Sequence, residues 1–171
     1  IIVLLTGYAL LAWRDLRVAL ITLSGLLPIY LLRFDIGPIP TTVLEIMIFI
    51  ALGIWLTQGH TKSGVTKLHH FRPWMLPGLL LLAAACFGVV VAPDTFDALG
   101  IWKAYFVEPL IVFILLMTVL KKNDWEWIIR TLSSSALVIS IAAIAQYLTG
   151  LGIPAPWDLE RRVTGIFEYP N

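Results

Sequence analysis

The sequence predicts an all-α protein, a polytopic transmembrane bundle of about six spanning helices, and three observations lead to this class. Hydrophobic residues make up 59% of the chain and charged residues only 13%, whereas a soluble domain carries about 25% charged residues. The apolar residues gather in long runs, without the alternation of period two that a membrane β-barrel requires. Most tryptophans lie near the ends of these runs, as in the aromatic belts of membrane proteins: Trp13, Trp55, Trp74, Trp102, Trp125 and Trp127.

Six apolar runs are expected to form the spanning helices, at residues 1–13, 18–32, 41–56, 74–92, 101–120 and 125–148. A span needs about 20 mostly apolar residues, so the first run is short, and we expect it to have lost its start. The second run is short too, and Pro28 and Tyr30 suggest a bent end near an interface. The third follows the break at Pro38-Ile-Pro40, and the last three runs come closest to the length of a span.

The lysines and arginines of the connections predict the orientation of the bundle. Connections one, three and five hold seven of them, whereas connections two and four and the tail hold four. The first group is therefore expected on the cytoplasmic side and the tail on the outer side. We divide the chain into a transmembrane bundle (1–149) and the truncated start of an extracytoplasmic loop (150–171). We expect the natural chain to continue beyond Asn171.

Ionisable residues gather toward the outer ends of the predicted spans and in the tail: Arg33, Glu45, Lys103, Glu108, Arg161 and Arg162. Charges within spans are costly, and they usually face a cavity, a partner or the protein interior. Arginine binds phosphate through a planar fork of donors, so one interpretation is an outward-facing cationic pocket for an anionic headgroup such as a lipid-linked diphosphate. The other interpretation is structural, with Arg33–Glu45 and Lys103–Glu108 as pairs that fix packing.

The helix around Glu108 carries a second signal. Lys103 and Glu108 are five residues apart, so in an α-helix they do not share a face, and each is expected to look toward another helix. Pro109 follows directly and disfavours helical geometry at Glu108. A polar group beside a helix break at membrane depth indicates a cavity.

Other polar residues receive plainer interpretations. The pair Asp94 and Asp97 is better explained as a turn and helix cap than as a cation site. The histidines have no metal-ligand spacing and are expected to be solvated loop residues: His60, His69 and His70. No metal, nucleic-acid or nucleophile site is predicted, and no catalytic residue is assigned.

Two features of the last run remain open. Residues 133–135 are three consecutive serines, interpreted as small residues that let helices approach closely. Gln146 and Tyr147, near the outer end, are expected either to line a pocket or to anchor the helix at the interface.

Three segments carry a resemblance to a known family. The tail Arg162-Val-Thr-Gly-Ile-Phe-Glu-Tyr-Pro-Asn171 resembles the R-x-T-G-x-F-x-x-P-N segment of the O-antigen ligase and O-antigen polymerase family of bacterial membrane proteins. Leu32-Arg-Phe34 with Pro40-Thr-Thr-Val-Leu-Glu45 is similar to a segment between early helices of that family, and Gly100-Ile-Trp-Lys-Ala-Tyr-Phe-Val-Glu-Pro109 is similar to another.

The resemblance implies a multi-helix enzyme of the bacterial cytoplasmic (inner) membrane. Members take a glycan from undecaprenyl diphosphate at the outer face and pass it to a lipid A–core, protein or glycan acceptor, with no cofactor and no metal. Fixed cations would then stabilise the diphosphate leaving group, and membrane lipid would surround the bundle. The family's functional Arg and His residues lie in later helices and a large outer loop, so we expect them downstream of Asn171.

Two alternatives stay open at the sequence level. A membrane transporter for a small anion such as bicarbonate would use Glu45 and Glu108 in ion passage. A structural membrane subunit would use all of these charges for packing alone.

Overall fold

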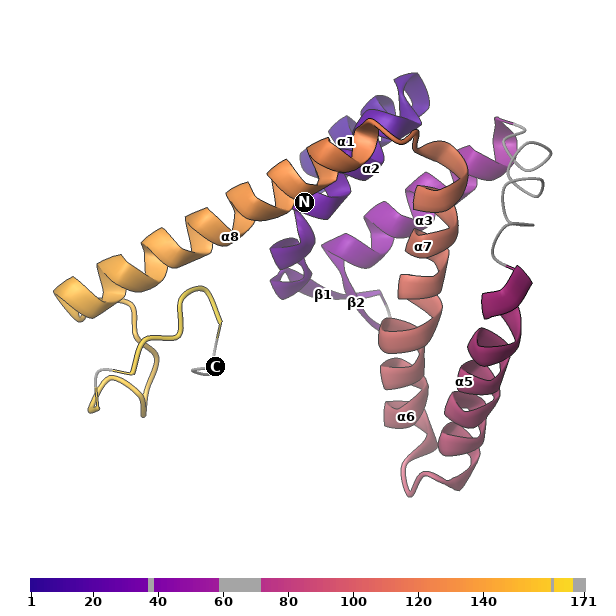
Figure 1. Cartoon of the computed structure of the whole chain (residues 1–171). Coiled ribbons are helices and arrows are strands. Elements are labelled where there is room, and N and C mark those ends of the chain that lie inside the picture. Colours follow the sequence, from indigo (N-terminus) through magenta and orange to yellow (C-terminus); the bar gives the residue numbers. More distant parts are fainter. Residues whose placement is uncertain (37–38, 59–71, 161, 168–171) are drawn as a thin grey trace.

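The computed structural model describes residues 1–36, 39–58, 72–160 and 162–167, and most of these residues are helical, as an all-α protein requires (Figure 1). The elements follow in the order α1 (Ile2–Arg14), α2 (Leu16–Gly25), η1 (Leu27–Leu31), β1 (Arg33–Ile36), β2 (Ile39–Thr42), α3 (Val43–Thr57), α5 (Arg72–Val91), α6 (Thr95–Trp102), η3 (Lys103–Val107), α7 (Glu108–Val119) and α8 (Asp124–Thr149).

The core lies where α1, α2, α3 and α7 meet. These helices contact one another, and the side chains between them are fully buried: Ala12, Leu20, Leu23, Met47 and Leu115. Alanine at the closest points lets the backbones approach, while leucine and methionine fill the space between them. This core supports the elements that carry the ionisable residues.

The first two helices form a hairpin around Asp15. Its carboxylate accepts hydrogen bonds from the backbone N–H groups of Arg17 (2.9 Å) and Val18 (3.2 Å) and so caps α2. The α-helix ends at Gly25, and the chain continues as the 3₁₀ turn η1 with Pro28 in its first turn. The bent end expected at Pro28 is confirmed, but it leaves α2 much shorter than the predicted run 18–32.

A two-stranded antiparallel ribbon is the one departure from an all-helical fold among the described residues. Strands β1 and β2 pair with Arg33 opposite Thr42 and Phe34 opposite Thr41. The ribbon leads directly into α3, because the Thr42 hydroxyl accepts a hydrogen bond from the backbone N–H of Glu45 (3.1 Å) and caps that helix.

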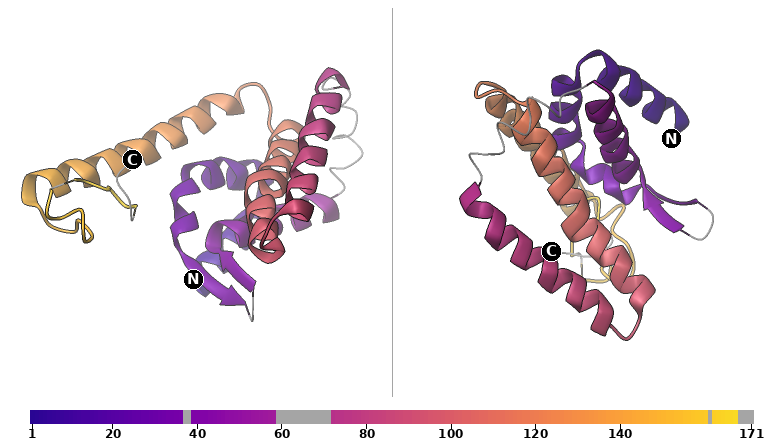
Figure 2. Two further views of the ribbon diagram at one scale, coloured as in Figure 1. Left: turned by 90° about the horizontal axis from the view of Figure 1, so that it is seen from below. Right: turned by 90° about the vertical axis from the view of Figure 1, so that its right-hand side faces the viewer.

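Helices α6 and α7 form one continuous rod with η3 between them, and α5 runs antiparallel beside it (Figures 1 and 2). The rod begins at Thr95 rather than near residue 101. Asp94 accepts hydrogen bonds from the N–H groups of Phe96 (2.9 Å) and Asp97 (3.1 Å), which starts the helix early. The interpretation of Asp94 as a helix cap is therefore confirmed.

Helix α8 packs its first turns against α2 and then runs away from the other helices. The tail after Thr149 lies beneath the far end of α8, apart from the ribbon and the α6–η3–α7 rod, as both Figure 1 and the left view of Figure 2 show. The predicted boundary near residue 150 thus coincides with the end of the last helix.

Among the described residues, two helices are long and apolar enough to cross a membrane, Thr95–Val119 and Asp124–Thr149. The six-span bundle is therefore not shown. The remaining apolar helices are shorter: α1, for example, has 13 residues, about 20 Å at 1.5 Å per residue, against a hydrocarbon layer of about 30 Å. Helix caps and proline cut the apolar runs into pieces that hydropathy alone does not separate.

Candidate functional site

A half-buried ion pair links the start of α3 to the middle of the α6–η3–α7 rod. The ammonium of Lys103 donates to Oε1 of Glu45 at 2.8 Å, and the Thr41 hydroxyl donates to Oε2 at 2.8 Å. Both oxygens of a carboxylate that is almost fully buried are thus satisfied. The pair is an interhelical contact, as the structural interpretation required, but the partners are Glu45 and Lys103 rather than Arg33–Glu45 and Lys103–Glu108.

A widened turn explains why Lys103 and Glu108 come together. Residues of η3 form a π-helical turn, in which the N–H of Glu108 donates to the carbonyl of Lys103, five residues earlier. One extra residue in the turn rotates everything that follows by about 100° relative to an α-helix. Pro109, which has no N–H to donate, is accommodated directly after it.

The expected helix break at Pro109 is therefore wrong. Glu108 has helical dihedral angles (φ −62°, ψ −47°), and the rod continues through it. Because the π turn brings residue i+5 above residue i, Lys103 and Glu108 share a face after all. That face lies against the start of α3 and Glu45.

Glu108 is the second buried carboxylate of this group. Its side chain lies within electrostatic reach of Glu45 and Lys103, is 9% exposed, and forms no hydrogen bond or ion pair with a described residue. It lines an apolar groove of about 320 Å³ between α3, η1 and α7. We name Glu45, Lys103 and Glu108 the acidic cluster, because two carboxylates face one ammonium.

The acidic cluster differs from the expected cationic pocket. Its single cation is already bound to Glu45, so a phosphate here would meet a surplus of negative charge. The substrate-binding role expected of Glu45, Lys103 and Glu108 toward an anionic headgroup stays a prediction that this geometry does not favour.

Arg33 lies on the ribbon beside the acidic cluster. Its side chain is exposed and forms no ion pair within the described part of the chain. In the ribbon it lies opposite Thr42, the residue that caps α3. An exposed guanidinium next to a fixed helix start is available to an external anion.

The tail carries the remaining predicted cations. The guanidinium of Arg162 stacks over the Trp157 ring, 5.1 Å from its centre, and lies 3.9 Å from Glu160. The tail that carries Arg162 lies beneath the far end of α8, apart from the α6–η3–α7 rod (Figure 1), while Arg161 lies outside the described residues. The structure does not bring the predicted site residues together in one pocket.

Gln146 was expected to line a pocket or anchor the helix, and instead it holds the tail. Its side-chain amide donates to the carbonyls of Gly152 (2.9 Å) and Gly165 (2.7 Å) and accepts from the N–H groups of Gly165 (2.8 Å) and Thr164 (3.3 Å). Gly165 adopts φ +64°, a conformation that glycine permits. The Thr-Gly of the resembling tail segment is thereby docked against the end of α8.

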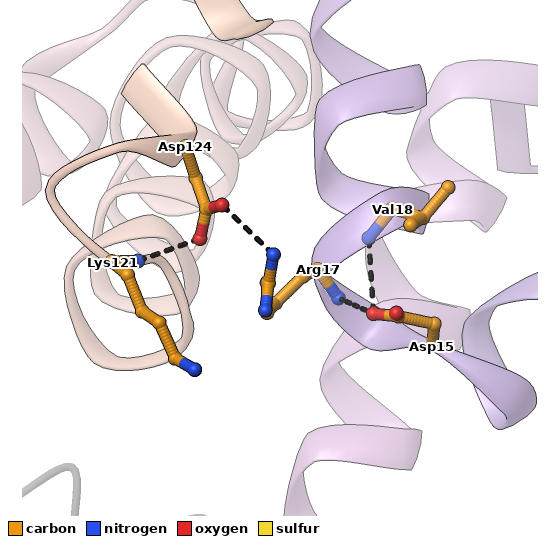
Figure 3. A network of polar contacts seen from close by, with 5 residues as sticks. All are labelled: Asp15, Arg17, Val18, Lys121 and Asp124. Atoms are coloured by element: carbon orange, nitrogen blue, oxygen red, sulfur yellow. Dashed lines mark hydrogen bonds and ion pairs between the residues drawn. The ribbon is translucent and has the colours of Figure 1, made fainter. Parts of the chain in front are cut away.

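A second network lies at the other end of the bundle (Figure 3). Arg17 contacts Asp124 at 2.9 Å, and the other carboxylate oxygen of Asp124 accepts from the backbone N–H of Lys121 at 2.8 Å. This network joins the connection between α1 and α2 to the connection between α7 and α8. Both connections were predicted on the cytoplasmic side, so the contact agrees with their being on one side.

The described residues contain no group of three or more His, Cys, Asp or Glu side chains arranged to hold a metal ion. The histidines fall outside those residues. Comparison with known proteins finds no matching family model, no similar curated protein and no similar solved structure.

Proposed function

We propose that this chain is part of a membrane enzyme that transfers a glycan from undecaprenyl diphosphate to an acceptor, of the O-antigen ligase or polymerase type. One observation carries the proposal beyond the sequence resemblance. The Lys103–Glu45 ion pair joins two of the three resembling segments, which are 58 residues apart at this contact. Segments that share a family pattern and meet in space are expected to serve one site.

The division of roles follows from charge. The Lys103–Glu45 ion pair, with the Thr41 hydroxyl on Glu45, fixes the ribbon and the α6–η3–α7 rod relative to each other. Arg33, exposed on that ribbon, is the residue we assign to the diphosphate of the donor, because a bidentate guanidinium stabilises the negative charge of a leaving phosphate. Arg162 provides a second exposed cation on the docked tail.

The proposal includes a place in the cell. We assign the chain to the bacterial cytoplasmic membrane as a multi-pass protein, with the ribbon, the α5–α6 turn and the tail on the outer side. The two long apolar helices support an association with a membrane. Lipid-linked donors are presented at such a surface, and the acceptor would be a lipid A–core or a second lipid-linked glycan.

Transport of a small anion such as bicarbonate is the second candidate. Buried Glu45 and Glu108 within the helices favour an ion-handling role. However, their surplus of negative charge opposes the passage of an anion, so the glycan-transfer proposal has more support.

The test reconstitutes the natural reading frame that contains this chain into proteoliposomes. Undecaprenyl diphosphate-linked glycan serves as donor, and lipid A–core or a second lipid-linked glycan serves as acceptor. Arg33→Gln is expected to raise the KM for the donor about tenfold or more, since a charge-assisted bond to phosphate is lost. Arg130→Gln is the matched control, because Arg130 is also exposed but bonds Glu126 on the same helix.

Three outcomes decide between the candidates. Transfer that depends on Arg33 and not on Arg130 supports the enzyme. Transfer that is equally fast in Arg33→Gln overturns the assigned role of Arg33. Absence of transfer with either acceptor, together with bicarbonate flux into the same liposomes, replaces the enzyme with the transporter.

A further inference from the structure

The side chain of Glu108 has no use in the proposed glycan transfer, and its surroundings require an explanation. It is 9% exposed and lacks a hydrogen bond or ion pair to any described residue. A carboxylate that lines an otherwise apolar groove without a partner is costly, so proteins retain one where a partner binds or a function needs it. The π turn directly before it is a further mark of functional sites.

The groove beside Glu108 is otherwise apolar. Its walls come from Leu44 and Ile48 of α3, and from Val112 and Leu116 of α7. Its volume of about 320 Å³ lies at the lower end of the range for small-molecule sites. Glu108 is the one charged residue of this lining, so a single polar group directs the orientation of any occupant.

Charge complementarity identifies the head of that occupant. Lys103 already lies 2.8 Å from Glu45, which leaves the second carboxylate of the acidic cluster without a counter-ion of its own. An anion is repelled by this surplus, and an uncharged occupant leaves Glu108 uncompensated. A cation with N–H donors compensates the charge and supplies the missing hydrogen bonds.

We propose that the groove binds an amphiphile with a primary ammonium head and an apolar chain. The ammonium lies against the carboxylate of Glu108, and the chain lies between α3 and α7. This inference is independent of the glycan-transfer proposal, which assigns its substrate contacts to Arg33 and Arg162 and not to the groove.

The test uses the full chain in lipid nanodiscs and a dodecylamine that carries a photoreactive diazirine in its chain. Mass spectrometry of the cross-linked protein is expected to place adducts on α7 near Val112. Unlabelled dodecylamine should compete for this site, whereas dodecanol and dodecyl sulfate of the same chain length should not. Equal competition by dodecanol would show that the groove binds an apolar chain without selecting an ammonium head, and would overturn the proposal.

Two variants test separately the charge of Glu108 and the space in the groove. Glu108→Gln should bind the amine about tenfold more weakly, because a charge-assisted hydrogen bond is lost, while Glu126→Gln, an exposed position on α8, should bind as the parent does. Val112→Trp fills the groove with Glu108 intact and should abolish labelling. Undiminished labelling in folded Glu108→Gln refutes the proposal; if that variant does not fold, undiminished labelling in Val112→Trp refutes it.

Discussion

Replacing Gln146 should release the tail from α8 without unfolding the helix. The side-chain amide makes three short hydrogen bonds to Gly152 and Gly165, between 2.7 and 2.9 Å, and a longer one of 3.3 Å to Thr164. These bonds connect residues that are up to 19 positions apart. Gln146→Ala removes all of them at once.

The magnitude follows from the number of bonds. A net hydrogen bond contributes about 0.5–1.5 kcal/mol, and water replaces part of this at the half-buried Gln146. We therefore expect a loss of about 2 kcal/mol, which raises the population of the released tail about 30-fold. Gln146→Glu keeps the acceptor but directs a carboxylate at the carbonyls of Gly152 and Gly165, so it should release the tail at least as much.

Hydrogen exchange in nanodiscs measures this opening directly, because Gln146 protects the N–H groups of Thr164 and Gly165. Exchange of the peptide that contains these two residues should accelerate in Gln146→Ala and in Gln146→Glu. Tyr147→Phe, an adjacent exposed position, should exchange as the parent does. Unchanged exchange in Gln146→Ala would show that the amide does not hold the tail.

Two further predictions concern the buried pair and the orientation. Lys103→Met leaves Glu45 buried without its counter-ion and should destabilise the protein by about 3 kcal/mol. In thermal unfolding followed by tryptophan fluorescence, the double variant Lys103→Met/Glu45→Gln should be less destabilised than Lys103→Met alone. A larger loss of stability in the double variant would contradict this explanation. The orientation is tested with a membrane-impermeant thiol reagent in a Cys86→Ser background. Asn123→Cys should react only after the cytoplasmic side is opened, whereas Leu159→Cys should react from outside. Labelling of both cysteines from one side would refute the predicted topology.

The sequence predicted the bounds of two helices well. Runs 41–56 and 125–148 match Val43–Thr57 and Asp124–Thr149 within about two residues. Run 101–120 began too late, because the first turns of α6 mix apolar residues with Asp97 and Gly100 and are fixed by the cap at Asp94. Hydropathy does not detect a helix start that depends on a side-chain cap.

The candidate residues were better predicted than their partners. Lys103 and Glu108 were assigned to different helix faces because an α-helical period was assumed. The π turn between them changes this period and places both residues on one face. Pro109, one residue past the turn, was the available signal for a local irregularity. The Thr42-Val-Leu-Glu45 sequence also fits a capping box, in which the two side chains each accept from the other residue's backbone N–H. Only the Thr42 hydroxyl makes its bond of this motif, because the Glu45 carboxylate accepts from Lys103 instead.

The role of Gln146 had no usable signal in the sequence. Its partners lie in an irregular segment after the helix, and the contacts depend on how that segment turns back. The two glycines that Gln146 contacts, Gly152 and Gly165, adopt positive φ angles of +75° and +64°. Long-range contacts of a loop are set by tertiary packing, which local periodicity does not contain.

The exposure of the two long helices bears on what surrounds them. A long apolar helix is either the core of a soluble protein or a helix that faces an apolar medium. Only 11% of the most apolar window of Thr95–Val119 and 6% of that of Asp124–Thr149 is buried. Most of each helix therefore lies outside the core, to which α7 contributes Leu115.

Three hydroxyl groups of α8 are satisfied within the helix itself. The hydroxyls of Ser134, Ser140 and Thr149 each donate to the carbonyl four residues earlier in the same helix, at 2.7–2.9 Å. Such back-bonding satisfies a polar side chain without help from solvent or a neighbouring helix. An exposed apolar helix in which these three hydroxyls are satisfied internally can lie in a bilayer, which is compatible with the membrane assignment.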